Sequence, residues 1–290
     1  MEQALYTDDL LLAIGKKIKL IVCDLDGTLL NSKKTIPPAN MAAIRAARER
    51  GICVTICTGR IPEMSDTFAQ LLEINGLYIA VNGAFIVDSR DMSKPYQNYI
   101  NSEEVRQFLL FCAERGFDHI AATSECCYYS KGSYRIRRLE AYNELAKENN
   151  FKQIPLYTFD SDYSEILDMQ VYKLMIYNLS EQELDDAKSF LDSLSSMGYT
   201  FSEPNLLDIF AKGLNKGTGI QNLARMMDIK KEEVCAFADY DNDIPMFDAA
   251  GLSVAMVNGV DALKNQAMLI TGTNDQNGVA MAIERYILGV

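Results

Sequence analysis

Short runs that are apolar at nearly every position alternate with segments of helical spacing at the start of the chain. The runs KLIVC (residues 19–23), ICVTIC (52–57) and LYIAV (77–81) do not follow a regular apolar and polar alternation. Such runs are typical of strands that are buried on both faces of a parallel sheet. The segments between them, near residues 38–50 and 64–72, place apolar residues three or four positions apart, as a helix does. This order predicts parallel strands joined by right-handed crossover helices.

The pattern changes over residues 85–210, where helical segments alternate with shorter and more polar strands. Amphipathic spacing predicts helices over residues 102–116, 135–150 and 180–198. Ser102 is the expected N-cap of the first of these helices, because its hydroxyl can accept a backbone N–H of the first turn. Strands are predicted over residues 85–90, 96–100, 119–130 (as a strand pair), 171–179 and 199–211 (as two short strands). The mixture predicts a separate α+β domain.

The regular alternation of strand and helix returns after residue 210. Apolar runs predict strands over 233–238, 252–256 and 269–271, and helical spacing predicts helices over 215–228, 261–267 and 278–288. We therefore predict an α/β fold with a doubly wound parallel sheet, formed by residues 1–84 and 211–290. The inserted α+β domain comprises residues 85–210. Residues 1 to about 16 are predicted to be an N-terminal extension that contains a short surface helix.

Polar residues follow the predicted strands at the positions where parallel strands end together. Asp24 and Asp26 come directly after the first run, and Gly27 lets the chain turn sharply there. Two carboxylates at this spacing can face one site and serve as a nucleophile and as a general acid and base. Thr58 ends the second strand, and Lys216 lies at the start of a predicted helix, where a cation and free N–H groups suit a phosphate. Each feature alone is also compatible with an ordinary solvated loop.

The segment Asp239-Tyr240-Asp241-Asn242-Asp243 is a second concentration of charge directly after an apolar run. Carboxylates that lie close together repel one another unless a cation neutralises them. A polar loop is the alternative interpretation of this segment. The combination of an aspartate pair, a hydroxyl, a lysine and this cluster favours a site for phosphate and a hard cation.

Composition and charge exclude several other classes of function. The formal net charge is −12, so the overall field of the protein repels nucleic acid and anionic membranes, and neither is a predicted partner. His119 is the single histidine, which rules out a metal site built from several histidines. Seven cysteines without a CxxC pair, and no apolar stretch of about 18 residues, predict reduced thiols in a cytoplasmic protein. The oligomeric state cannot be predicted.

Four motifs in order resemble those of the haloacid dehalogenase (HAD) superfamily: DLDGTL, CTGR, NKG and ADYDND. VNGA at residues 81–84 and the late segment NDQNGVA also resemble the Cof-type, type IIB branch, whose large α/β cap lies between the second and third motifs. The chain departs from the family pattern at Ala238, where glycine is usual. It also departs at residues 256–259, where MVNG replaces Met-Gly-Asn-Ala.

The resemblance implies a magnesium-dependent phosphatase that acts on small phosphorylated metabolites such as sugar phosphates. Asp24 would attack phosphorus, and Asp26 would protonate the leaving oxygen and later activate water. The implied phosphate-binding residues are Thr58, Gly59, Lys216 and Asn242. The implied ligands of Mg2+ are Asp24, Asp26 (through its backbone carbonyl) and Asp239. Asp243 would either bind the ion through water or orient Lys216 and the waters on the metal.

Three functions other than a phosphatase share features of this pattern. A phosphotransferase or phosphomutase would use the same aspartyl phosphate but pass the phosphoryl group to a second metabolite. A binding protein on an inactivated scaffold is disfavoured, because all the charged motif residues are present. A dinucleotide-binding oxidoreductase is disfavoured because no GxGxxG follows the first strand. In the predicted cap, the basic stretch 131–138 indicates either attraction of anionic substrates or a solvated helix face.

Overall fold

The computed structural model describes residues 6–160, 163–166, 168–203 and 205–290. Its residue contacts divide the chain into two compact units. The first unit comprises the chain up to Thr58, Ala69–Pro95 and Asn215–Val290, and the second comprises Gly59–Phe68 and Tyr96–Leu214. The domain boundaries at residues 84/85 and 210/211 stay a prediction. Within the described ranges, every helix is too short or too polar to cross a membrane.

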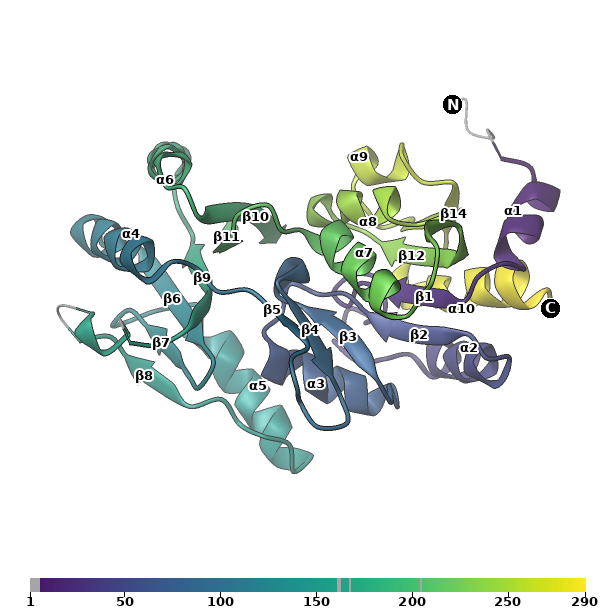
Figure 1. Cartoon of the computed structure of the whole chain (residues 1–290), viewed down its shortest axis with the longest axis horizontal. Helices are drawn as coiled ribbons and strands as arrows, with labels where there is room; N and C mark the ends of the chain where they lie inside the picture. The colour runs from purple at the N-terminus through teal and green to yellow at the C-terminus, as the bar shows by residue number, and fades with distance from the viewer. Residues whose placement is uncertain (1–5, 161–162, 167, 204) are drawn as a thin grey trace. The chain divides into compact units, whose positions relative to one another are not determined.

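A five-stranded parallel sheet forms the centre of the first unit (Figure 1). In spatial order its strands are β14 (Leu269–Thr271), β13 (Leu252–Met256), β12 (Val234–Ala238), β1 (Leu20–Cys23) and β2 (Cys53–Ile56). Leu20 lies opposite Val234 on one side and Cys53 on the other. Every residue of β1 and β12 is buried, because helices cover both faces of the sheet. The apolar runs therefore identified these strands correctly.

The third apolar run does not continue this sheet as predicted. β3 (Leu77–Ala80) pairs antiparallel with β4 (Phe85–Asp88), and a single parallel bridge, from Cys57 to Ile79, connects it to the end of β2. The chain reverses at the short helix η1 (Val81–Gly83), whose residues all have positive φ. This reversal turns β4 back along β3, so that the antiparallel pairing replaces a further parallel strand.

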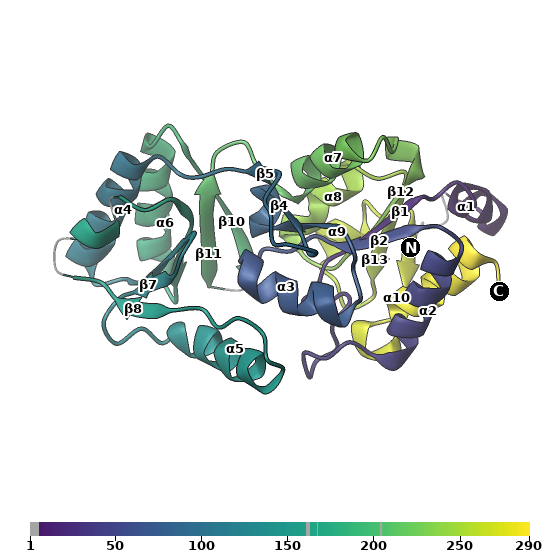
Figure 2. The same cartoon turned by 60° about the horizontal axis from the view of Figure 1, so that its bottom comes forward.

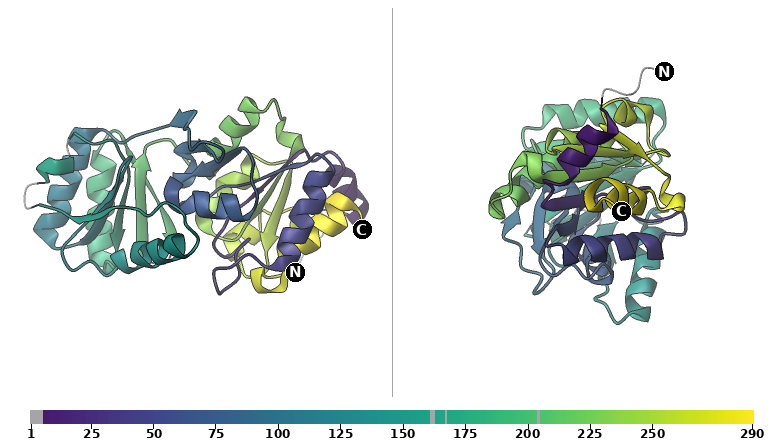
Figure 3. Two further views of the ribbon diagram at one scale, coloured as in Figure 1. Left: turned by 90° about the horizontal axis from the view of Figure 1, so that it is seen from below. Right: turned by 90° about the vertical axis from the view of Figure 1, so that its right-hand side faces the viewer.

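The helices of the first unit cover the sheet and join the two ends of the chain. The α-helices are α1 (Asp8–Gly15), α2 (Pro38–Glu49), α7 (Lys216–Met226), α8 (Ile244–Asp248), α9 (Asp261–Lys264) and α10 (Gly278–Ala282). α10 continues directly into a π-helix, η6 (Ile283–Leu288). Three short helices complete the unit: η3 (Lys231–Glu233), η4 (Asp241–Asp243) and η5 (Asn274–Gln276). α2 lies beside α10 (Figure 2). α1 confirms the helix predicted in the N-terminal extension; residues 1–5 of that extension lie outside the described residues. α1 lies beside η6 near the C-terminus (Figure 3). Asp8 of α1 contacts Arg285 and Tyr286 of η6.

A six-stranded mixed sheet forms the second unit. In spatial order its strands are β10 (Met197–Glu203), β11 (Leu206–Ala211), β9 (Val171–Tyr177), β6 (Asp118–Thr123), β7 (Cys127–Tyr129) and β8 (Leu156–Thr158). Its helices are α4 (Ser102–Arg115), α5 (Ile136–Glu148), α6 (Glu181–Ser193) and the short η2 (Ser164–Ile166), and β5 (Tyr96–Gln97) is a two-residue strand. The helix α3 (Pro62–Leu71) contributes its residues up to Phe68 to this unit and the remainder to the first unit.

The core of the second unit lies between its sheet and the helices α4 and α6. Phe108 and Leu191 from these helices pack with Leu174 of β9 in one buried cluster.

α4 begins at Ser102 as predicted, but the expected N-cap was wrong: the Asn101 side chain accepts the Glu104 N–H at 3.1 Å. Asn101 has the extended conformation that a cap residue requires, and Ser102 is already helical.

Glu104 joins α4 to the loop before β10, and we expect its contribution to stability to depend on pH. Burial opposes its ionisation, but hydrogen bonds from the hydroxyls and backbone N–H groups of Ser195 and Ser196 lower the pKa of Glu104 to about 2. The ionised form therefore stabilises the fold above the unfolded pKa near 4.5, and this contribution is lost as the pH falls from about 4.5 towards 2.

Glu104→Gln should therefore lower the free energy of unfolding of the second unit at pH 7, by about 1 kcal/mol after allowance for solvent screening. Denaturant unfolding at several pH values measures this difference, which should shrink below about pH 4.5. Glu103→Gln, next to it on the exposed side of α4, is the matched control and should have little effect. A difference that stays constant from pH 7 down through the window between about pH 4.5 and 2 would contradict the assigned role of the carboxylate.

Candidate active site

Two neighbouring strands of the parallel sheet deliver aspartates to the same edge. Asp24 follows β1, and its backbone N–H donates to Phe237 O in β12 at 3.0 Å. Asp239 follows β12, and the helix η4 continues the chain to Asp243. Because parallel strands end at one edge of a sheet, residues more than 200 positions apart in sequence become neighbours here.

Lys216 connects this edge to the first turn of α7. The side chain of Asn215 caps the helix by accepting the Thr218 N–H at 2.9 Å, so that Lys216 is the first helical residue. The Lys216 Nζ lies 2.6 Å from Asp24 Oδ1 and also binds Asp243 Oδ1. All three side chains are buried, and one ammonium group therefore holds two carboxylates away from solvent.

Both carboxylate oxygens of Asp243 accept hydrogen bonds. While Oδ1 binds Lys216, Oδ2 accepts the backbone N–H groups of Asp239 and Tyr240, at 3.2 and 3.0 Å. These bonds fold the acidic segment back on itself. Asp243 therefore orients both the lysine and the loop that carries Asp239.

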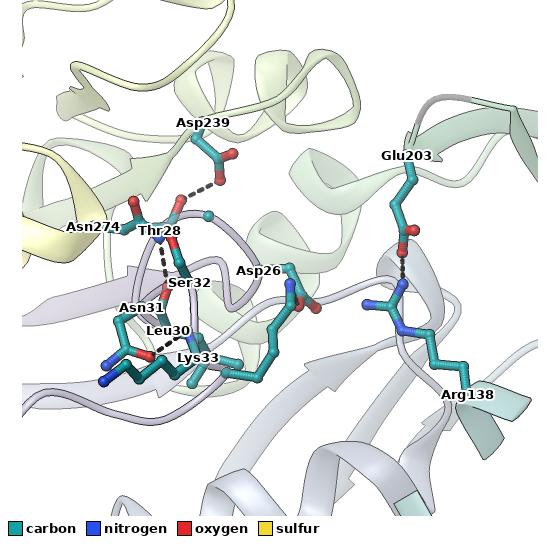
Figure 4. Close-up of polar contacts among 12 residues, drawn as sticks. Asp26, Thr28, Leu30, Asn31, Ser32, Lys33, Arg138, Glu203, Asp239 and Asn274 are labelled. Atoms are coloured by element: carbon teal, nitrogen blue, oxygen red, sulfur yellow. Dashed lines mark hydrogen bonds and ion pairs between the residues drawn. The ribbon is translucent and has the colours of Figure 1, made fainter. Parts of the chain in front are cut away.

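Asp239 lies against the loop that follows Asp24. Thr28 Oγ1 donates to Asp239 Oδ1 at 2.6 Å, as Figure 4 shows. Gly27 has a φ of +87°, and a Cβ at this position would lie 2.2 Å from Asp239 Oδ2. Only glycine combines this backbone conformation with so close an approach of the carboxylate.

The carboxylates of Asp24, Asp239 and Asp243 fit a divalent cation. One oxygen from each lies within 4.8 Å of the others, and all three residues are buried. Three carboxylates against the single charge of Lys216 leave a formal excess of two negative charges, which is the charge that a divalent cation neutralises. An all-oxygen donor set is typical of hard cations such as Mg2+ and Ca2+.

The pKa values of these residues also favour a cation at this position. Burial raises the pKa of Asp24 well above its usual value, even though Lys216 acts against the shift, and Asp243 and Asp239 add to it. Burial and the nearby Asp243 raise the pKa of Asp239 to about 7. For Lys216, burial disfavours the charged form, but Asp24 and Asp243 raise its pKa above the usual value. The protein thus keeps a charged lysine beside Asp24 and Asp239, whose ionised forms a further cation would favour.

The other predicted site residues occupy different environments. The Asp26 carboxylate is partly exposed and forms an ion pair with Lys34. Asn242 donates to Asn82 Oδ1 at 3.3 Å, and the Asn82 N–H donates to the carbonyl of Thr58 at 3.0 Å. This chain of contacts connects the end of β2 with the acidic loop.

Gly59 is the first residue of the second unit. Its carbonyl accepts a hydrogen bond from Lys173 Nζ at 2.7 Å, and the same ammonium group forms a buried ion pair with Asp208. The arginines of the basic stretch also pair within this unit: Arg135 and Arg138 both bind Glu203. Two of the charges considered for substrate attraction are therefore engaged with a carboxylate.

Three residues that support the site had no predicted role. Thr28 contacts Asp239, Asn82 joins Thr58 to Asn242, and Asn258 donates to the carbonyl of Gly27 at 2.8 Å. Thr28 and Asn82 lie within the quoted motifs, and this was the available signal. Asn258 keeps the asparagine of the family's Met-Gly-Asn-Ala stretch, from which only residues 257 and 259 depart, so it also carried a signal.

Known proteins resemble this chain over most of its length. The profile of the haloacid dehalogenase-like hydrolase family matches residues 21–283. A relative from Bacillus subtilis, the 5-amino-6-(5-phospho-D-ribitylamino)uracil phosphatase YwtE, is 30% identical over 94% of this chain and 99% of its own length.

Solved structures of the same class resemble this fold. A haloacid dehalogenase-like hydrolase from Bacteroides thetaiotaomicron superposes with a TM-score of 0.79 at 28% identity, over 92% of this chain and 99% of its own. The subclass IIB sugar phosphatase BT4131 superposes with a TM-score of 0.76 at 26% identity, over 92% and 98% of the two chains. This chain therefore belongs to the haloacid dehalogenase-like hydrolases and is an enzyme of their phosphatase type.

Proposed function

We propose that this enzyme is a magnesium-dependent phosphatase that hydrolyses small phosphomonoesters through an aspartyl phosphate on Asp24. The observation that supports this most strongly is the buried contact of Lys216 with both Asp24 and Asp243, beside Asp239. Phosphoryl transfer depends on positioning and charge compensation more than on elaborate bond chemistry. A preorganised ammonium group among carboxylates meets that requirement.

In the first step, a carboxylate oxygen of Asp24 forms a bond to phosphorus while the ester P–O bond breaks. Asp26 donates a proton to the departing oxygen, which leaves as an alcohol. Lys216, Thr58 and Asn242 bind the phosphoryl oxygens, with the backbone N–H of Gly59, and Lys216 reduces the repulsion between the two anions.

In the second step, Asp26 takes a proton from water, whose oxygen attacks phosphorus as the bond to Asp24 breaks. Inorganic phosphate leaves, and both aspartates return to their initial state. Asp24, Asp239, Asp243 and the backbone carbonyl of Asp26 would hold Mg2+. When bound, the ion supplies positive charge that offsets the charge of the phosphoryl oxygens.

For the substrate, we propose a phosphate ester on a polyhydroxylated carbon chain, such as a sugar phosphate. Two of the similar proteins support this class: the name of one specifies a phosphorylated ribityl chain, and the other is a sugar phosphatase. A panel of phosphomonoesters that includes D-ribose 5-phosphate tests it directly. Release of free phosphate distinguishes hydrolysis from transfer to a second metabolite, which is the alternative activity. We also propose a cytoplasmic location, which the seven free thiols support.

Removal of divalent cations should abolish activity, and added Mg2+ should restore it. The same ion should raise the melting temperature, because it binds the folded state; at 100 times its dissociation constant the gain is about 2.7 kcal/mol. Asp239→Asn should lose most of this stabilisation, since it removes one of the three clustered carboxylates. Full activity after exhaustive chelation, with no thermal shift on addition of Mg2+, would refute the proposed cofactor.

A further inference from the structure

Lys34 makes a contact with the active-site loop that the proposed mechanism does not use. Its Nζ lies 2.7 Å from Asp26 Oδ1, and both residues belong to the first unit. The Lys34 side chain is 55% exposed and that of Asp26 is 26% exposed. Ion pairs with this degree of exposure add little to stability, so stability alone does not account for the geometry that brings the two groups together.

A hydrogen-bonded turn directs Lys34 back to Asp26. The Asn31 side-chain oxygen accepts the backbone N–H groups of Lys33 and Thr35, each at 3.0 Å. The Asn31 N–H donates to Thr35 O, and the Lys34 N–H donates to Asn31 O. Within this turn Lys34 has a φ of +60°, a conformation that is uncommon for residues other than glycine and asparagine. The chain therefore holds a lysine where glycine would fit with less strain.

Two further contacts anchor the turn to the rest of the first unit. Asp275 accepts the backbone N–H and the hydroxyl of Ser32, at 2.8 and 2.6 Å, and the Asn274 side chain donates to Leu30 O at 2.9 Å. Figure 4 shows the Asp26 side chain close to the segment from Asn31 to Lys33. These hydrogen bonds fix the turn, and the turn sets the position from which the Lys34 side chain reaches Asp26.

We propose that Lys34 is a positioning residue for the general acid and base. Its ammonium group engages Oδ1 of Asp26 and so keeps the carboxyl group in the orientation from which a proton passes to the leaving oxygen. This inference rests on the proposed function, in which Asp26 supplies that proton. General acid catalysis is sensitive to small errors of placement, so a contact that fixes one oxygen of this carboxyl group affects the proton transfer.

The dependence of kcat on the leaving group distinguishes the positioning role from a general loss of activity. An alkyl phosphate such as D-ribose 5-phosphate needs a proton on its leaving oxygen, whereas p-nitrophenyl phosphate releases a stable phenolate without one. Lys34→Met should lower kcat by about tenfold for the fastest alkyl phosphate of the panel and by less than about twofold for p-nitrophenyl phosphate. KM should change little for either ester. Lys34→Arg, which keeps the charge, should recover most of the rate.

Two further variants show whether Lys34 acts through Asp26. In an Asp26→Asn background, Lys34→Met should cause no additional loss on the alkyl phosphate, because the group it positions is gone. Lys34→Gly relieves the backbone conformation and removes the ammonium group, so it should fold at least as well as wild type and still show the selective loss. Lys33→Met, at the neighbouring exposed lysine, is the matched control and should have wild-type rates.

The possible results overturn the inference separately from the proposed function. Equal losses on both esters, a change confined to KM, or a faster Lys34→Met enzyme would each refute the positioning role. Wild-type kinetics in Lys34→Gly would refute it as well. If the wild-type enzyme hydrolyses none of the esters, or if Asp24→Asn remains fully active, the proposed function itself fails.

Discussion

Asp24→Asn is expected to abolish turnover while the fold stays as stable as that of the wild-type enzyme. The amide nitrogen and oxygen of asparagine cannot displace the ester oxygen at phosphorus as a carboxylate does, so kcat should fall by roughly 10⁴-fold or more. The carboxamide oxygen can still accept the bond from Lys216. Because burial raises the pKa of Asp24, the charged form is disfavoured in the fold, and its removal has little cost.

The melting temperature of Asp24→Asn should therefore lie within about 3 °C of the wild-type value, which corresponds to about 1 kcal/mol. Rapid acid quenching of the wild-type reaction with labelled substrate should leave the phosphoryl group on the peptide that contains Asp24, and the variant should show none. Asp228→Asn is the matched control, because this aspartate is exposed and its φ of +53° is readily adopted by asparagine. Activity of Asp24→Asn within tenfold of wild type would exclude Asp24 as the nucleophile.

Lys216→Met should reduce both activity and stability, and it should have the largest effect on stability among these substitutions. The variant leaves Asp24 and Asp243 buried without their shared ammonium group. Breaking a buried ion pair from one side typically lowers the free energy of unfolding by about 3–5 kcal/mol. Loss of one preorganised group that stabilises the transition state should lower kcat by about 10²–10³-fold as well.

Chemical denaturation and steady-state kinetics measure the two losses, and a second substitution separates them. Adding Asp243→Asn to Lys216→Met removes one of the buried charges, so part of the stability should return while activity stays low. Lys231→Met, at an exposed lysine, should match wild type in both assays. If Lys216→Met were as stable as wild type, the buried contact would not contribute to the fold in the way described.

The sequence by itself determined the class of fold and the edge at which the site forms. Runs such as those of β1 and β12 are apolar at every position, and only a strand covered on both faces buries them completely. Since parallel strands end together, Asp24 and Asp239 were predicted to approach one another although 215 positions separate them in sequence. Gly27 was likewise predicted to let the chain turn sharply after the two aspartates, and it has the positive φ of such a turn.

Only the tertiary structure decided which groups meet at that edge. Periodicity does not specify which carboxylate a side chain contacts, so the bond from Thr28 to Asp239 and the pairing of Lys34 with Asp26 were not predicted. The pairing of β3 was not predictable either, because its apolar run is compatible with a parallel or an antiparallel partner. The chain reversal after β3 brings β4 alongside it as an antiparallel partner. Local sequence patterns indicate which residues are buried. Which residues they contact depends on hydrogen bonds between segments that are distant in sequence.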